Sequence, residues 1–266
     1  MTASAYAIRY RPSEVADGHW QTVTSVRSKG AALDEVASWS YVNLRHGDLV
    51  DVEGPRYRAL RVFDGATGEL RPLPSSIGVG PWEGPGADPA KMLAVASRAG
   101  VDRRRLSLAA CECAATSLRF VPEGRSAPRE ALLAVAKWAG GDRRIEPFIP
   151  ALAWLSDAAP AGDPANARWV LAAAACHRAA LSVGVGREEL AGLLREAVEF
   201  AAGCAVVNSD EYQSTRMPSA LYTRRVREAS LGMAEVVRRW APLSVVACAR
   251  LRMPEPAPLR PGMADL

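Results

Sequence analysis

Chemically reactive side chains are scarce in this sequence. Histidine occurs three times, at His19, His46 and His177, cysteine occurs five times, and aromatic residues make up 6% of the 266 residues. No Ser-His-Asp signature, HExxH pair or paired-carboxylate pattern stands out. The sequence therefore predicts no catalytic residue, no metal site and no cofactor, which argues against an enzyme.

Long hydrophobic runs are also missing. Arg, Glu or Gly interrupts every alanine-rich segment before it reaches the roughly 20 apolar residues that span a bilayer. The start, MTASAYAIRYRP, lacks the charged and apolar regions of a secretory signal. The odd number of cysteines has no regular spacing and does not suggest a disulfide framework. We expect no membrane role and a reducing cytoplasm.

Charge of one sign does not dominate the chain. Its 33 basic and 29 acidic side chains give a net charge of +4, and hydrophobic residues make up 49%. These values are typical of a globular protein that buries a core, and a mild positive charge neither requires nor excludes an anionic partner. At about 100–200 residues per domain, the length favours two domains.

Residues 1–74 carry strand signals and predict a small α+β domain with a mainly antiparallel sheet. Apolar and polar residues alternate in short segments bounded by turns. Within Lys29–Trp39, Leu33, Val36 and Ala37 have helical spacing, which predicts one short helix against the sheet. The expected strands are AYAIRY, HWQTVTSV, DLVDVEG, RYRALRVFDG and ELRPL.

The segment Arg56–Val62 alternates arginine with apolar residues, and we expect its arginines to share one face of a strand. An exposed basic strand that carries an aromatic residue can contact nucleic acid or an acidic protein. The solvated face of a half-buried sheet accounts for the same pattern. Both interpretations stay open.

Residues 75–87 are dense in proline, glycine and serine, and we expect them to link two domains. They form no phosphate-binding loop, because the Lys-Ser/Thr ending is missing and the prolines remove backbone donors. Beyond the linker the pattern is helical, which predicts a bundle of about six helices over residues 88–252. Four prolines in residues 253–266 predict an extended tail.

The stretch Ser107–Gly141 predicts two helices joined by a turn. Cys111 and Cys113 are two residues apart in the first helix, so they point about 160° away from each other and cannot bind one metal ion. We expect both thiols in the core, where free cysteine is common, with metal or redox chemistry as the alternative. In the second helix Ser126 is the expected cap, and Gly140-Gly141 is the expected end.

We expect a helix to begin at Asp163-Pro164, since proline favours the first position of a helix. This helix is apolar nearly all round, so it should lie at the centre of the bundle. His177 lies on this helix, and we expect it to be hydrogen-bonded and partly buried. The alternative is a catalytic site in which His177 and one cysteine converge with a carboxylate. Cys176 is a poor partner, since it points about 100° away from His177.

One family resemblance is carried by these helices. Ala110–Ala114 reads ACECA, and after a short turn Ala127–Ala131 reads APREA and leads to KWAG at Lys137–Gly140. This pattern resembles the helical module of the Imm-5 or Imm-5-like immunity proteins, which have Ala-Cys-Asp-Cys-Ala, Arg-Pro-Arg-x-Ala and Trp-x-x-Gly followed by alanine-rich helices. Here Glu112 stands for the Asp. Ala172–Ala175 lie in an alanine-rich helix where the family has one.

The resemblance covers about residues 100–205 and leaves the sheet domain and the C-terminus unmatched. It implies a helical fold and an immunity role, in which the protein neutralises a toxin by stoichiometric contact. Fold analogy of this kind is associational evidence for function.

Two neighbouring surfaces are the expected recognition sites. After the helix predicted at Arg187–Ala202, a polar segment breaks the periodicity, and the next helix, Ser219–Trp240, places arginines opposite its apolar arc. From Arg216 to Arg252, eight arginines against two glutamates give a local charge of +6. The predicted partner-binding residues are Asp210, Glu211, Tyr212, Arg216, Arg224, Arg225, Arg227, Arg238 and Arg239.

Simpler interpretations exist for both surfaces. The polar segment can be a plain connection between helices, and the arginines can form a solvated face with favourable cations near a helix C-terminus. The leading hypothesis is a non-enzymatic protein that binds a partner protein. The alternative is a nucleic-acid-associated or phage-defence component, since arginine forms bidentate pairs with phosphate. The partner, the oligomeric state and the role of the N-terminal domain stay open.

Overall fold

A computed structural model describes residues 6–13, 20–39, 44–55, 57–74, 80–82, 87–123, 126–142, 144, 167–207 and 219–254. These residues form two compact units. Unit 1 takes those within Met1–Val79 and Pro242–Pro261, and unit 2 takes those within Gly80–Ala241. The division falls inside the predicted linker. The last helix, which we predicted as part of the bundle, belongs to unit 1.

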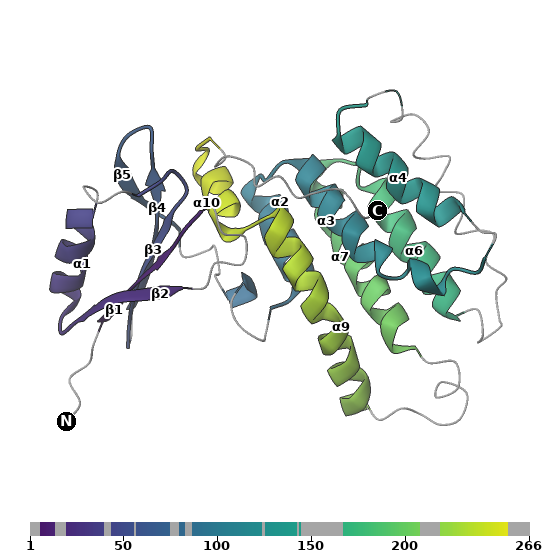
Figure 1. The fold of residues 1–266 in the computed structure, drawn as a ribbon, viewed down its shortest axis with the longest axis horizontal. Coiled ribbons are helices and arrows are strands. Elements are labelled where there is room, and N and C mark those ends of the chain that lie inside the picture. The colour runs from purple at the N-terminus through teal and green to yellow at the C-terminus, as the bar shows by residue number, and fades with distance from the viewer. Residues whose placement is uncertain are drawn as a thin grey trace. The chain divides into compact units, whose positions relative to one another are not determined.

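Unit 1 is built on a five-stranded antiparallel sheet with the strand order β2-β1-β3-β4-β5 (Figure 1). The strands form where apolar and polar residues alternate between turns, so the predicted α+β layout is confirmed. β2 and β5 are the two edges of the sheet. The strands are β1 (Tyr6–Arg11), β2 (Gln21–Val26), β3 (Leu49–Gly54), β4 (Tyr57–Asp64) and β5 (Glu69–Pro72).

The helix α1 (Lys29–Ser38) packs on one face of this sheet (Figure 1). It begins at Ser28, whose Oγ accepts a hydrogen bond of 3.1 Å from the Ala31 N–H. Ala32 and Val36 are fully buried against Ile8, Val50 and Val52 of the sheet, whereas Ala37, which we expected on the same apolar face, is exposed.

The prediction that the arginines of β4 share one face is wrong. Arg58 and Arg61 are three residues apart, and side chains alternate between the faces of a strand, so the two point in opposite directions. Arg58 lies on the face of Leu60 and Val62, both of which are buried. Arg56 lies outside the described residues.

The helix α10 (Leu243–Leu251) completes unit 1 and contacts β4. After it, the Pro254 carbonyl oxygen lies 2.8 Å from His46 Nε2, while His46 Nδ1 accepts a hydrogen bond of 3.0 Å from the Gly65 N–H. Because Nδ1 is an acceptor, the proton of the neutral ring lies on Nε2 and is donated to Pro254. His46 thus links the segment after α10 to the β4–β5 turn.

Unit 2 is helical (Figure 1). Six α-helices lie in its described part, in agreement with the predicted bundle. Its helices are the 3₁₀ helix η2 (Gly80–Trp82), α2 (Pro89–Ala99), α3 (Arg103–Ala115), the 3₁₀ helix η4 (Leu118–Phe120), α4 (Ala127–Ala139), α6 (Ala167–Leu181), α7 (Arg187–Val206) and α9 (Ser219–Trp240).

Local sequence signals set several of these boundaries. The Asp88 side chain accepts a hydrogen bond of 3.1 Å from the Lys91 N–H, and α2 ends at Gly100 with φ 97°; Asp before Pro89 and a glycine after the last turn are the start and stop signals that the sequence carries for this helix. Ser126 precedes α4 but makes no side-chain cap bond, unlike the prediction. The expected start at Asp163-Pro164 lies outside the described residues.

The helix α7 is longer than predicted. It continues through Val206 instead of ending at Ala202, so Cys204, which we placed in the polar segment, is helical and buried. α7 packs against α6, and most of the buried residues of α6 are alanines. The buried residues of α6 are Trp169, Ala172, Ala173, Ala175, Cys176, Ala179 and Ala180.

No helix in the described ranges combines the length and the apolar character needed to cross a bilayer. Apolar residues are instead distributed over helices that pack on one another, with charged residues on their outer faces. Arg178 of α6, for example, forms an ion pair of 2.9 Å with Glu196 of α7.

Candidate functional site

The two predicted recognition surfaces differ in what the structure describes. Asp210, Glu211, Tyr212 and Arg216 lie outside the described residues. The arginines of α9 lie inside them, on a helix with the predicted boundaries, Ser219–Trp240.

Glutamates of the same chain pair with Arg224, Arg238 and Arg239 of α9. Arg224 Nε lies 2.9 Å from Glu228 on the exposed side of the helix. Arg238 binds Glu235 and also donates to the Trp82 carbonyl at 3.3 Å. Arg239 bonds to Glu112 of α3. Much of the predicted positive face is therefore neutralised within the chain.

Glu112 holds α9 against α3. Its Oε1 accepts a hydrogen bond of 2.6 Å from Arg239 Nη1, and its Oε2 accepts one of 2.6 Å from Trp240 Nε1. Nearby, the Cys113 Sγ lies 3.7 Å from the Met233 carbonyl oxygen. The central residue of the ACECA stretch thus binds the end of another helix, a contact that sequence periodicity does not predict.

The five cysteines form no disulfide and are buried, as expected for Cys111 and Cys113. Burial raises the pKa of the Cys111 thiol and that of the Cys113 thiol well above their usual range, and it raises the pKa of Cys176 and of Cys204 to about 12. The described residues hold no cluster of three or more His, Cys, Asp or Glu side chains suited to a metal ion. His177 is partly buried on α6.

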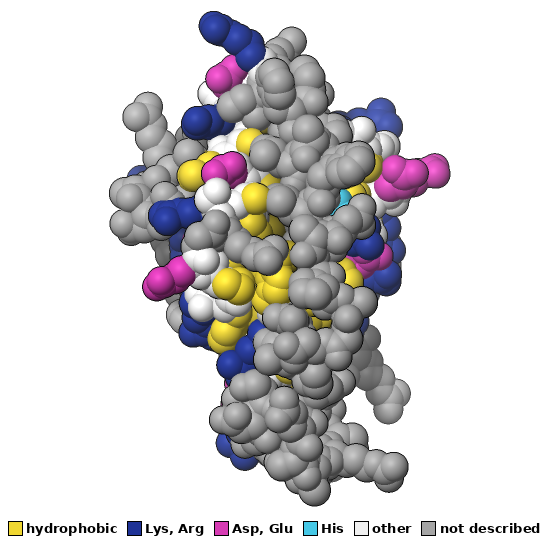
Figure 2. Space-filling view, turned by 90° about the vertical axis from the view of Figure 1, so that its right-hand side faces the viewer, with side chains coloured by type: hydrophobic (Ala, Val, Ile, Leu, Met, Phe, Trp, Pro, Cys, Tyr) yellow, Lys and Arg dark blue, Asp and Glu magenta, His cyan; other side chains and the backbone are white. Residues whose placement is uncertain are grey.

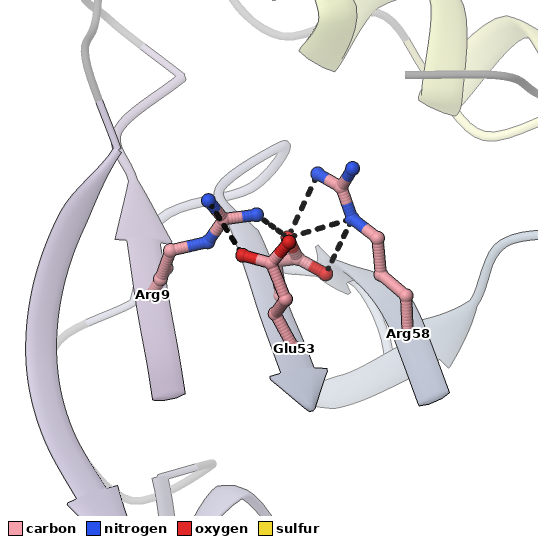
Figure 3. Close-up of polar contacts among 4 residues, drawn as sticks. Arg9, Glu53 and Arg58 are labelled. Carbon is pink, nitrogen blue, oxygen red and sulfur yellow. Dashed lines mark hydrogen bonds and ion pairs between the residues drawn. The ribbon is translucent and has the colours of Figure 1, made fainter. Parts of the chain in front are cut away.

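A charge cluster lies across β1, β3 and β4 in unit 1. Asp51 is fully buried and binds both Arg9 and Arg58, with the Arg58 Nη2 at 2.9 Å. Arg9 also lies 2.9 Å from Glu53 (Figure 3) and 5.3 Å from the Trp20 ring centre. Figure 3 shows Arg9 and Arg58 approaching from neighbouring strands on either side of Glu53. Two guanidinium groups and two carboxylates balance in charge, and their contacts join β1, β3 and β4.

A groove of about 680 Å³ lies on unit 2 between α2, α7 and α9. Its floor is apolar and made mostly of small side chains, and its rim carries three basic and two acidic residues. The floor residues are Ala87, Pro89, Ala90, Ala94, Val198, Ala202 and Val226. The charged rim residues are Asp88, Lys91, Arg195, Glu199 and Arg227.

The rim charges are arranged in neighbouring pairs. Lys91 Nζ lies 3.1 Å from Asp88, and Arg195 lies 3.7 Å from Glu199. Arg227 is the only rim residue that the sequence analysis predicted to bind a partner. The groove was missed because its residues come from three helices that are far apart in the chain, and no local pattern marks them.

Basic and hydrophobic side chains are distributed unevenly on the face of the molecule drawn in Figure 2. Figure 2 shows hydrophobic side chains in the middle of that face and Lys and Arg side chains towards its margins. Val170 on α6 and Leu231 on α9, exposed by 39% and 38%, are apolar residues of unit 2 that solvent reaches.

The chain matches no protein-family model, no curated protein and no solved structure.

Proposed function

We propose that this chain is a non-enzymatic cytoplasmic protein that binds a partner protein stoichiometrically, as an immunity protein binds a toxin. The observation that carries the proposal is the groove between α2, α7 and α9. An open groove with an apolar floor and a charged rim is the usual setting for an amphipathic segment of a partner.

The residues of the groove indicate the chemistry of that segment. Small floor residues such as Ala90, Ala94 and Ala202 allow a partner backbone to come close, and its apolar side chains can bury against Val198 and Val226. The rim has one more basic than acidic side chain, so the partner segment should carry an apolar stripe flanked by acidic residues.

The role of other polar groups supports binding rather than catalysis. Glu112, Asp51 and Ser182 are engaged in contacts between secondary-structure elements, with Ser182 Oγ 2.7 Å from Ser107 Oγ. The thiols of α3, α6 and α7 are buried and keep their protons. Five cysteines without a disulfide also suit a reducing cytoplasm.

The test uses the protein encoded by the gene next to that of this chain. We expect the two purified proteins to form a 1:1 complex by light scattering and calorimetry, and we expect co-expression to relieve any toxicity of the neighbour. Arg227→Glu should weaken binding by about tenfold or more, because it reverses a rim charge.

Arg224→Glu is the matched control. Arg224 lies three residues from Arg227 on α9 but outside the groove, so its reversal should leave the affinity within about threefold. A neighbour that neither binds nor is neutralised would overturn the immunity proposal, and turnover of a substrate by the purified chain would overturn the non-enzymatic one.

A further inference from the structure

The two edges of the sheet in unit 1 differ in chemistry. β5 has only four residues, Glu69-Leu70-Arg71-Pro72. These residues include charges of both signs and a proline. Short length, charge and proline are among the devices by which proteins prevent an edge strand from pairing with another chain. β5 is therefore a protected edge.

β2 carries none of these three devices. Its six residues, QTVTSV, include no charge, no proline and no glycine. The three consecutive residues Thr22-Val23-Thr24 are β-branched, which favours a strand. On one side β2 pairs with β1, and no strand among the described residues pairs with its other side. Its outer backbone N–H and C=O groups therefore face away from the sheet and can accept another strand.

β2 contains a β-bulge at Val23. The register between β1 and β2 shifts between Ile8 and Arg9, because Ile8 pairs with Thr24 while Arg9 pairs with Thr22. Val23 is the extra residue, and its side chain is 55% exposed, more than that of any other exposed large hydrophobic residue described. Bulges redirect a side chain at a sheet edge, and here the redirected side chain is apolar.

We propose that β2 pairs antiparallel with β2 of a second copy of this chain, so that two five-stranded sheets form one continuous sheet about a two-fold axis near Val23. The strand is compatible with itself, since uncharged residues face uncharged residues across the axis. With Val23 opposite Val23 of the partner, the nearest arginine, Arg27, lies beyond Trp20 at the start of the partner strand and not beside a second Arg27. β-branched residues that face each other in this way stabilise a strand pair.

The difference between the edges also sets the size of the assembly. A sheet with two free edges would add copies without limit, whereas a sheet with one free and one protected edge stops at two. Six-residue strands bury little area compared with the about 1,200 Å² of stable complexes. We therefore expect a dimer that forms as the protein concentration rises. This surface lies in unit 1 and does not depend on the groove of unit 2.

Cysteine cross-linking of the full chain tests the proposal. All five native thiols are buried, so Val23→Cys introduces a reactive surface thiol next to the two-fold axis. We expect mild oxidation to produce a disulfide-linked dimer from this variant. Val170→Cys is the matched control, because Val170 is also an exposed valine but lies in unit 2, and oxidation should give no disulfide-linked dimer of this variant.

Sedimentation of the unmodified chain over a range of concentrations gives the second readout. Val23→Lys, checked for folding by circular dichroism, should raise the dimer dissociation constant about tenfold or more, because it places like charges near the axis. Val170→Lys should leave it unchanged. A chain that stays monomeric up to its solubility limit with no Val23→Cys cross-link overturns the proposal. A dimer that Val23→Lys does not weaken also overturns it.

Discussion

Single carboxylates hold together segments that are far apart in the sequence. Asp48 is fully buried and accepts hydrogen bonds of 2.7 Å from the Tyr10 hydroxyl, 2.7 Å from the Ser13 N–H and 2.9 Å from the Arg45 N–H. A buried carboxylate is tolerated only when such donors replace water. These contacts tie the loop before β3 to the end of β1.

The first prediction concerns Asp64. A hydrogen bond from the Ala66 N–H lowers the pKa of this carboxyl below its usual 3.8, burial acts in the opposite direction, and Arg71 lowers the pKa further. A folded-state pKa below the unfolded one means that the ionised group stabilises the fold above about pH 4, and that this contribution is lost as the pH falls through the folded pKa.

We therefore expect the free energy of unfolding of the native chain to fall more steeply on acidification than that of Asp64→Asn. Urea unfolding at a series of pH values between neutral and strongly acidic conditions measures both slopes. Equal slopes would show that Asp64 does not contribute in this way.

The second prediction concerns Glu112. Glu112→Ala leaves the Trp240 Nε1 donor and the Arg239 guanidinium without their carboxylate, and Trp240 is only 9% exposed. A buried donor without a partner costs about 1–3 kcal/mol, and we expect a loss of stability of that size in chemical unfolding.

The control for Glu112 is Glu228→Ala. Glu228 forms an ion pair with Arg224 on the exposed side of α9, where both side chains are more than half exposed. Its removal should change the stability by less than about 1 kcal/mol. A similar effect of the two substitutions would mean that Glu112 contributes only as a surface charge.

The effect of a glycine on the stability of a helix depends on its position. Glycine is unfavourable inside a helix, whereas it is favoured where the backbone after the helix is left-handed. Gly232 lies inside α9, where an added Cβ would meet no atom within 4 Å. Gly141 follows α4 with φ 109°, a conformation that other residues rarely adopt. The same substitution should therefore have opposite effects at the two positions.

The third prediction follows from these positions. Gly232→Ala should raise the free energy of unfolding by about 0.5–1 kcal/mol, because alanine is the better helix former. Gly141→Ala should lower it by about 1 kcal/mol, because a Cβ strains the left-handed conformation. Denaturant unfolding of both variants measures the two changes, and a stabilised Gly141→Ala would contradict the stated geometry.

Across the whole molecule, the reactivity of the cysteine thiols indicates whether the chain is folded. All five are buried, and the folded-state pKa of Cys176 and Cys204 is raised to about 12 by burial. Because a thiol reacts as the thiolate, a protonated and buried thiol is inert. The folded-state pKa of these thiols lies above the unfolded-state pKa, which is near 9. The contribution of the protonated thiols to the free energy of unfolding is therefore present below the unfolded-state pKa and is lost as the pH rises towards 12.

The fourth prediction is that a thiol reagent at mildly alkaline pH labels the native chain slowly and labels five thiols in guanidinium chloride. Val170→Cys provides a positive control, because its new thiol is on the surface and should react at once. Rapid native labelling of any original cysteine would show that its helix opens readily.

Several elements of the fold could be predicted from the sequence because their signals are local. Alternation in QTVTSV and YRALRVFD predicts strands, and Asp88-Pro89 followed by Gly100 predicts the ends of α2. The end of α7 could not be predicted, because Cys204 and Val206 extend the helix by packing in the core and not through their own propensity. The prediction that Arg58 and Arg61 share one face of β4 was wrong because they are three residues apart, and residues an odd number apart in a strand lie on opposite faces.

The candidate sites divide in the same way. Sequence alone determined that α9 carries a run of arginines, that α3 carries two thiols on opposite faces and that β2 is an uncharged strand. Only the tertiary structure decided that Arg239 pairs with Glu112, that α2, α7 and α9 enclose a groove and that β2 lies at the edge of the sheet. Helix and strand patterns arise from neighbours within a few residues, whereas pairing and edges depend on which distant segments meet.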